Sequence, residues 1–175
     1  MPKQSHSTTP THQIRPLVPA DLEAVITLSL QAWEPVFVSF ESILGSATFD
    51  LLYRPDWRTA QTASVRKRCL ADGAESFILT TADGVVAGFV VLQQDQEESL
   101  GVIEMIAVHP EHQRRGYGRT LMKFAIQRLR DRGLELINVT TGGDPGHAPA
   151  RALYEAVGFT ALPLVNYYLP SRAAQ

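Results

Sequence analysis

The sequence predicts a single domain of the α/β class (α+β), in which helices flank a mixed and mostly antiparallel sheet. The first observation is the order of the patterns. Helical periodicity dominates up to residue 71, and a hairpin followed by strand, helix, strand and helix comes after it. The second is the composition, because 175 residues with 45% hydrophobic and 19% charged residues are typical of one globular domain with its own core.

The predicted domain covers residues 13–170. Residues 1–12 are rich in Ser, Thr, Pro and His and lack an apolar stretch, so they predict a disordered tail and not a signal peptide. Residues 171–175 are a short C-terminal tail. No apolar run approaches the roughly 20 residues that span a bilayer, which predicts a cytoplasmic protein without membrane contact. The net charge of −2 argues against general nucleic-acid binding.

The chain has one cysteine, Cys69, and five histidines. A single cysteine cannot form an intrachain disulfide, and its place in a helical stretch predicts an inert, structural thiol. The histidines lack the spacing and the neighbouring cysteines of a zinc site. We therefore expect no metal.

The N-terminal half begins with a short strand at residues 14–17. Asp21 then starts a helix whose apolar residues recur on one face. Pro35 is expected to interrupt this helix, because proline lacks the N–H that the helix needs. A second helical stretch follows with a break near Gly45, and an amphipathic helix is predicted at residues 57–71.

The C-terminal half alternates strands with helices. Its hairpin turns at Asp83-Gly84, a strong turn signal. The predicted strands are residues 76–81, 85–93, 100–108, 136–140, 159–161 and 165–169. The predicted helices are residues 119–130 and 148–157.

A glycine-rich turn between a strand and a helix is the most informative segment. It reads Gln113-Arg114-Arg115-Gly116-Tyr117-Gly118-Arg119. The start of a helix presents unpaired N–H groups and a partial positive charge, and it therefore binds phosphates. Neither a Walker loop nor a three-glycine dinucleotide fingerprint fits here. Taken alone, a tight turn with solvated arginines is an equally good interpretation.

Two motifs in this order resemble those of the GNAT superfamily of N-acetyltransferases. The glycine-rich turn is similar to the acyl-CoA loop Q/R-x-x-G-x-G/A of that family. About 40 residues later, the segment Ala150-Arg151-Ala152-Leu153-Tyr154-Glu155-Ala156-Val157-Gly158-Phe159 resembles its second signature, A-x-x-L-Y-E-x-x-G-F. Ile14-Arg15-Pro16 followed by Asp21-Leu22 resembles the usual opening, so the resemblance covers about residues 13–170.

The resemblance implies an enzyme that moves an acetyl group from acetyl-CoA directly to a primary amine. The strand at 103–108 would splay from the strand at 136–141, and the pantetheine arm would lie between them. Backbone N–H groups of residues 114–119 would hold the pyrophosphate. The implied cofactor-binding residues are Ile106, Ala107, Val108, Gln113, Arg114, Arg115, Gly116, Tyr117, Gly118, Arg119, His147 and Ala150.

Two residues are catalytic candidates. The resemblance places Tyr154 beside the cofactor sulfur, where a protonated hydroxyl would donate to the leaving thiolate. Glu104 shares one face of its predicted strand with Ile106 and Val108, and a carboxylate on an apolar strand is costly to bury unpaired. Glu104 is therefore a candidate to take the amine proton through a water or to bind an ammonium. An ion pair with an arginine is an equally good interpretation.

The sequence departs from the family pattern at His147. Many members carry asparagine seven residues before the signature tyrosine, where it contacts the cofactor arm. Imidazole is a candidate to replace that contact, and the 142–149 loop is an alternative wall of the acceptor pocket. His109 and His147 are weaker candidates for proton relays.

The acceptor is not identified by the sequence. The candidates to line its site are the aromatic residues Trp33, Phe37, Phe40, Tyr167 and Tyr168, together with the polar residues Glu34 and Asn166, although such aromatics more often form core. The leading prediction is acetylation of a small-molecule amine. A peptide or protein N-acetyltransferase and a non-catalytic acyl-CoA-binding regulatory protein are the alternatives, and a homodimer is left open.

Overall fold

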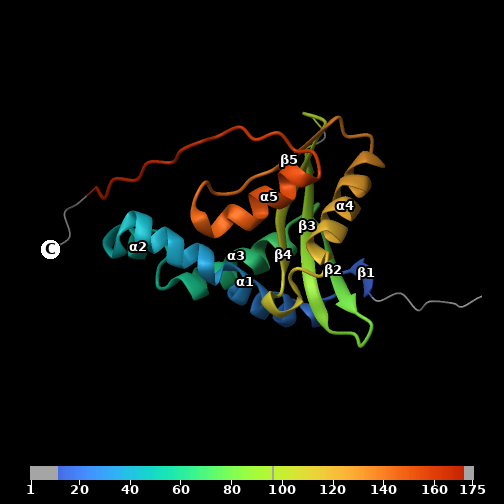
Figure 1. Cartoon of the computed structure of the whole chain (residues 1–175), viewed down its shortest axis with the longest axis horizontal. Coiled ribbons are helices and arrows are strands. Elements are labelled where there is room, and N and C mark those ends of the chain that lie inside the picture. Colours follow the sequence, from blue (N-terminus) through green and yellow to red (C-terminus); the bar gives the residue numbers. More distant parts are fainter. Residues whose placement is uncertain (1–11, 96, 172–175) are drawn as a thin grey trace, which may run out of the picture.

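The computed structural model describes residues 12–95 and 97–171, which form one five-stranded sheet with helices on both faces (Figure 1). The strands are β1 (His12–Pro16), β2 (Glu75–Thr81), β3 (Val86–Asp95), β4 (Leu100–Val108) and β5 (Leu136–Val139). The helices are α1 (Leu22–Leu44), α2 (Ser46–Leu52), α3 (Trp57–Cys69), α4 (Tyr117–Arg130) and α5 (Ala148–Ala156), and the short 3-10 helices are η1 (Pro19–Asp21), η2 (Pro110–His112) and η3 (Pro145–His147).

The strands follow one another in the order β1-β2-β3-β4-β5. The first three neighbouring pairs are antiparallel, and β4 and β5 are parallel. A parallel pair needs a crossover, which α4 supplies. This arrangement confirms the predicted mixed and mostly antiparallel sheet.

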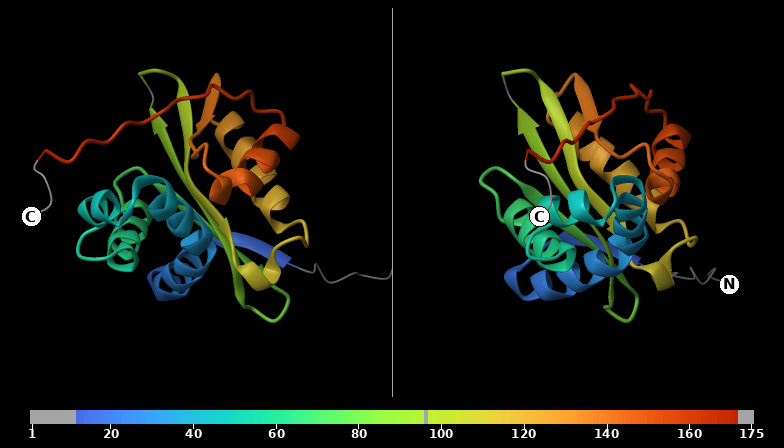
Figure 2. Two further views of the ribbon diagram at one scale, coloured as in Figure 1. Left: turned by 60° about the vertical axis from the view of Figure 1, so that its left-hand side comes forward. Right: turned by 90° about the vertical axis from the view of Figure 1, so that its left-hand side faces the viewer.

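Two hydrophobic cores lie on opposite faces of the sheet (Figure 2). Helices α1 and α3 cover one face, where Phe89 and Val91 are fully buried. Cys69 belongs to this core, and burial raises the pKa of its thiol. Helices α4 and α5 cover the other face, where Val90 and Leu121 are fully buried. The alternation of Phe89, Val90 and Val91 between the two cores follows from the two-residue repeat of a strand.

The central strands β4 and β5 separate along their length. They pair only from Leu100 opposite Leu136 to Ile103 opposite Val139. Strand β4 then continues to Val108, while β5 ends. The predicted divergence of these two strands is therefore confirmed, and it leaves one side of residues 104–108 without a neighbouring strand.

Helix α1 runs through Pro35, so the predicted interruption at this residue is wrong. Proline removes one helical hydrogen bond, but buried side chains on both sides of it hold the helix against the sheet and its neighbours. Leu28 before the proline and Phe37 after it are among them. The break near Gly45 is confirmed, because α1 ends at Leu44 and Gly45 has a backbone φ of 73°.

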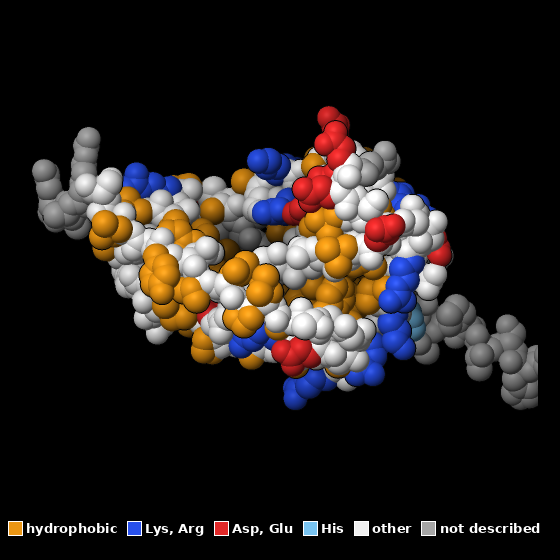
Figure 3. Space-filling view, turned by 90° about the horizontal axis from the view of Figure 1, so that it is seen from above, with side chains coloured by type: hydrophobic (Ala, Val, Ile, Leu, Met, Phe, Trp, Pro, Cys, Tyr) orange, Lys and Arg blue, Asp and Glu red, His pale blue; other side chains and the backbone are white. Residues whose placement is uncertain are grey.

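The two C-terminal strands predicted at 159–161 and 165–169 do not form. Their apolar residues indicated strands, but a strand needs a paired neighbour, and this segment follows α5 and crosses the top of the molecule (Figure 1). Leu164 is 79% exposed and Tyr167 is 92% exposed. Hydrophobic side chains are accordingly spread over the surface seen from above (Figure 3). The predicted tails at 1–11 and 172–175 lie outside the described residues, whereas His12 belongs to β1.

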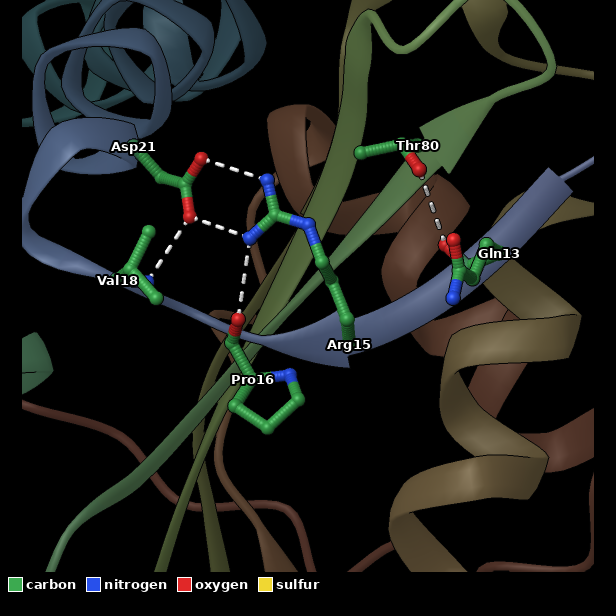
Figure 4. Close-up of polar contacts among 6 residues, drawn as sticks. All are labelled: Gln13, Arg15, Pro16, Val18, Asp21 and Thr80. Atoms are coloured by element: carbon green, nitrogen blue, oxygen red, sulfur yellow. Dashed lines mark hydrogen bonds and ion pairs between the residues drawn. The ribbon is translucent and has the colours of Figure 1, made fainter.

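An ion pair ties β1 to the start of α1 (Figure 4). Arg15 donates from Nη1 and Nη2 to the two carboxylate oxygens of Asp21, over 2.6 and 2.8 Å. The Val18 N–H donates to Asp21 Oδ2 over 2.9 Å. The hydrogen bond from Arg15 holds the pKa of the Asp21 carboxyl below its ordinary value, against the opposing effect of burial.

We expect Asp21→Asn to lower the free energy of unfolding at neutral pH by about 1–2 kcal/mol, because a charge-assisted hydrogen-bond pair is lost. A carboxyl with a lowered folded-state pKa stabilises the fold above its unfolded pKa, and that contribution disappears as pH falls through the folded pKa. Urea unfolding from pH 7 to pH 3 should therefore show the two proteins converging in acid. A difference that stays constant with pH would contradict this account of Asp21.

Candidate active site

A pocket of about 590 Å³ opens where β4 and β5 diverge. Its walls come from α1, α3, the second half of β4, three residues of the glycine-rich turn (Gln113, Arg114 and Gly118) and the chain between Val139 and Tyr154. Parts of the chain that are far apart in sequence therefore meet at the place where the sheet is split.

The glycine-rich turn presents a row of free backbone N–H groups at one end of the pocket. Gly116 precedes the first residue of α4 with φ 85° and ψ −4°, and Arg114 has φ 59°. Among the described residues, no hydrogen bond uses a backbone N–H of residues 114–119, and the next one, Thr120 N–H, donates to Gly116 O over 3.0 Å. A helix start with unpaired N–H groups suits an anion.

The two glycines of the turn differ in backbone conformation and in what a side chain at each position would contact. A side chain at Gly116 would meet nothing within 4 Å, so glycine is required there by its positive φ, and the space above the backbone stays open. A Cβ at Gly118 would lie 3.4 Å from Leu153 and 3.8 Å from Val108. Both are ordinary van der Waals distances, so Gly118 stands in contact with α5 and β4 without a close approach that only glycine would allow.

Tyr154 lies on α5, lines the pocket and is 9% exposed. Its ring packs near Phe159, with 6.1 Å between the centroids. Burial raises the pKa of the Tyr154 hydroxyl to about 12. The hydroxyl is therefore protonated at neutral pH and is able to donate a proton or a hydrogen bond into the pocket.

Glu104 lines the pocket at an irregular point of β4. Val91 of β3 lies opposite Met105, and Leu92 lies opposite Ile103, so the ladder skips Glu104. Such a bulge turns a side chain away from the regular alternation. The Glu104 carboxylate forms an ion pair with Arg68 of α3, on the face covered by α1 and α3.

The expected common face of Glu104, Ile106 and Val108 is therefore wrong. Ile106 and Val108 pack with the core under α4 and α5, on the other side of the sheet. The bulge is the physical reason, because one extra residue reverses the side of every residue that follows. Of the two interpretations that the sequence left open for Glu104, the structure contains the arginine ion pair.

His147 lies at the start of α5 and lines the pocket. Its Nδ1 is 2.5 Å from Oδ1 of Asp144. The ring lies 5.6 Å from that of Phe40 on α1, centroid to centroid. The side chain of Asp144 is only 5% exposed and that of His147 is 16% exposed.

Predicted cofactor residues fall into two groups. Eight of the twelve line the pocket: Ile106, Ala107, Val108, Gln113, Arg114, Gly118, His147 and Ala150. The other four are at the outer end of the turn and the start of α4: Arg115, Gly116, Tyr117 and Arg119. This distribution fits a long ligand with its phosphates outside and its reactive end inside.

Predicted acceptor residues are only partly brought together. Trp33, Phe37 and Phe40 line the pocket. Phe37 is also buried and stacks on Trp57 at 4.5 Å between centroids, as a core residue does. Glu34 instead pairs with Arg58 on the surface, at 2.8 Å, and Tyr167 is 92% exposed.

Comparison with known proteins identifies the family. The model of the Acetyltransferase (GNAT) family matches residues 40–159, which is more than half of the chain. The chain belongs to the GNAT acetyltransferase family. The motifs that resembled this family in the sequence lie at the pocket and at the start of α4.

Relatives of this GNAT protein act on different acceptors. This chain is 35% identical over 91 residues to the ribosomal protein bS18-alanine N-acetyltransferase of Salmonella typhimurium, and the match covers 52% of this chain and 59% of that protein. It is 36% identical over 100 residues to the streptothricin acetyltransferase of Streptomyces lavendulae, covering 50% and 49%. The chain thus spans between half and three fifths of the length of these curated relatives.

A solved structure shows the same fold. The ribosomal-protein-S18-alanine N-acetyltransferase from Escherichia coli matches with a TM-score of 0.60 and 26% identity, over 91% of this chain and 85% of that chain. The single GNAT-like domain predicted from the sequence is thereby confirmed.

Some residues in or directly behind the pocket of this GNAT protein had no role in the sequence-based prediction. Arg68 is separated from Glu104 by 36 positions, and nothing in either local pattern indicates their pairing. Tyr53 reaches the pocket from beyond the break at Gly45, and burial raises the pKa of its hydroxyl. Asp144 did carry a signal, since it stands three residues before His147 at the start of a helix.

Two negative findings apply to residues 12–95 and 97–171. Within these ranges, no three His, Cys, Asp or Glu side chains are grouped as a metal site requires. No helix in the same ranges is both long and apolar enough to cross a bilayer. The expected absence of a metal remains a prediction.

Proposed function

We propose that the protein is an acetyl-CoA-dependent N-acetyltransferase that moves the acetyl group directly to a primary amine of a small molecule. The observation that carries this proposal is one pocket lined both by the turn with its free N–H groups, through Arg114 and Gly118, and by Tyr154. Family membership supports the same reaction. Acetyl-CoA would supply an activated acetyl thioester.

The residues fit this ligand from end to end. Backbone N–H groups of residues 114–119 hold the pyrophosphate, with Arg114 and Arg115 adding positive charge. The unpaired side of β4 offers backbone groups of Ile106 and Val108 to the pantetheine amides and to the thioester carbonyl. Gln113 is fixed beside this strand, since its Nε2 donates to Val108 O over 3.1 Å.

Tyr154 and Glu104 have separate roles in the proposal. The Tyr154 hydroxyl gives its proton to the departing thiolate, for which its high pKa keeps it protonated. The Glu104 carboxylate is shared with Arg68, so it is suited to attracting an ammonium group into the pocket rather than to removing its proton.

A peptide or protein acceptor is the second candidate. It is favoured by the similarity to the bS18-alanine N-acetyltransferase. The aromatic walls of Trp33, Phe37 and Phe40, in a pocket of about 590 Å³, favour a small amine with apolar surface.

Acetyl-CoA turnover with a panel of amines tests the proposal. The probes are spermidine, L-lysine, kanamycin and a peptide with an N-terminal alanine. Mass spectrometry identifies the acetylated products. We expect acetylation of at least one small amine with a higher kcat/KM than the peptide. Acetylation of the peptide alone would favour the second candidate. Slow thiol release with no acetylated amine would indicate a non-catalytic acyl-CoA-binding protein.

A further inference from the structure

His147 lies in the wall of the pocket that also contains Tyr154, and the buried Asp144 contacts it from behind. Their short Nδ1–Oδ1 contact fixes the tautomer of the imidazole, because a carboxylate only accepts. The proton of the neutral ring therefore lies on Nδ1, and Nε2 carries the free lone pair. His147 is the N-cap of α5, seven residues before Tyr154, and both residues line the pocket.

The loop before α5 is built closely around this pair. Arg151 donates from Nη1 to the backbone oxygens of Gly142 and Asp144, over 2.5 and 2.8 Å. A Cβ at Gly142 would lie 2.3 Å from Asp144 Oδ1 and 2.6 Å from His147 Nδ1. A Cβ at Gly146 would lie 2.7 Å from the Cα of Val36 on α1. The positions of the two side chains are therefore fixed by their surroundings.

We propose that His147 is the base that takes the proton from the incoming ammonium, and that Asp144 positions its ring and stabilises the imidazolium. The inference rests on the acetyl transfer proposed above and adds a residue to it. Two observations carry it: the His147–Asp144 contact, and the place of His147 on the pocket wall with Tyr154. Glu104, the other candidate base, is engaged by Arg68.

The proton balance of the reaction needs such a group. A lysine-like amine has a pKa of about 10.4 and arrives as an ammonium at neutral pH. Nε2 of His147 takes the first proton. The neutral nitrogen bonds to the thioester carbonyl carbon, the C–S bond breaks, and the thiolate takes the proton of Tyr154. The new amide loses its second proton to the tyrosinate, and His147 returns the first one to solvent.

The charges around His147 are consistent with this role. Burial raises the pKa of the Asp144 carboxyl, but the hydrogen bond and charge of His147 outweigh it, so the pKa lies below its ordinary value. Asp144 is therefore ionised beside the ring. The other titratable groups of the pocket are Tyr53, Tyr154, Arg68, Glu104 and Arg114.

His147→Asn is the decisive variant, because an amide still donates to Asp144 but accepts no proton. The probe is whichever panel amine the parent acetylates with the highest kcat/KM. We expect a fall in kcat/KM of roughly 100-fold or more at pH 7, the usual contribution of a general base. The gap between parent and variant should narrow as the pH rises, because more of the amine then arrives unprotonated and needs no base. Asp144→Asn should also lower kcat/KM for the same amine, since the imidazolium loses its counter-charge.

Hydroxylamine is the matched control substrate, because it is largely unprotonated at neutral pH and needs no base. We expect His147→Asn to lose far less kcat/KM with hydroxylamine than with the panel amine. An equal loss with hydroxylamine would show a purely structural role for His147 and overturn the inference. Unchanged kcat/KM and an unchanged pH profile in His147→Asn would overturn the role of His147 as the base and leave the proposed acetyl transfer standing. A parent that acetylates neither hydroxylamine nor any panel amine would overturn the proposed function as well.

Discussion

Gly116→Glu is expected to abolish CoA binding while the protein stays folded. The new carboxylate would stand in the open space above the free N–H groups, where a side chain meets nothing within 4 Å. Two like charges about 5 Å apart repel by about 3 kcal/mol at an effective dielectric constant of about 20, which is a loss of affinity of at least roughly 100-fold. The positive φ of 85° adds strain for any residue with a side chain. Calorimetric titration with CoA measures the loss.

Gly133→Glu is the matched control. Gly133 follows the other end of α4, has φ 76° and also has open space around its Cα. The same strain and the same charge are thus introduced far from the proposed phosphate site. Normal CoA affinity in Gly133→Glu together with a large loss in Gly116→Glu supports the placement of the phosphates, and equal affinities in the two variants would refute it.

Tyr154→Phe should lower kcat by about 100-fold, because loss of a general acid typically costs a factor of 10² to 10⁴. The ring and its packing near Phe159 remain, so the Kd for CoA should change by less than about threefold. Because burial raises the pKa of this hydroxyl to about 12, the parent enzyme should show no loss of kcat from tyrosine ionisation up to pH 10.

Steady-state kinetics and CoA titration on the same preparations separate the two effects. A variant with unchanged kcat would exclude Tyr154 as the proton donor. A variant with a much weaker Kd and an unchanged kcat would make the hydroxyl a cofactor contact instead.

Local signals in the sequence predicted much of the fold. The glycine-rich turn and the strand before it form as expected, because positive-φ glycines and a helix start are decided within a few residues. The break at Gly45 and the hairpin at Asp83-Gly84 have the same local cause.

Features decided by distant contacts were not predictable in this way. Helix α1 continues through Pro35 because packing on both sides of it outweighs one lost hydrogen bond. The bulge at Glu104 depends on the register with β3, and its ion pair depends on where α3 lies. The C-terminal segment carries the composition of a strand but has no strand beside it.

The candidate site was predictable to the same extent. The residues of the two motifs meet in one pocket, since each motif is a local structure carried by one end of a helix. The acceptor side was not, because Arg68 and Tyr53 reach the pocket from separate segments, and Asp144 reaches His147 from behind the pocket wall. Only Asp144 had a local signal, its spacing from His147.

A crystal structure of the protein with CoA tests the central claim most directly. We predict the pyrophosphate within hydrogen-bonding distance of the backbone N–H groups of residues 114–119, and the thiol sulfur beside the hydroxyl of Tyr154. A pyrophosphate bound elsewhere, with those N–H groups facing only solvent or side chains of the protein, would contradict it.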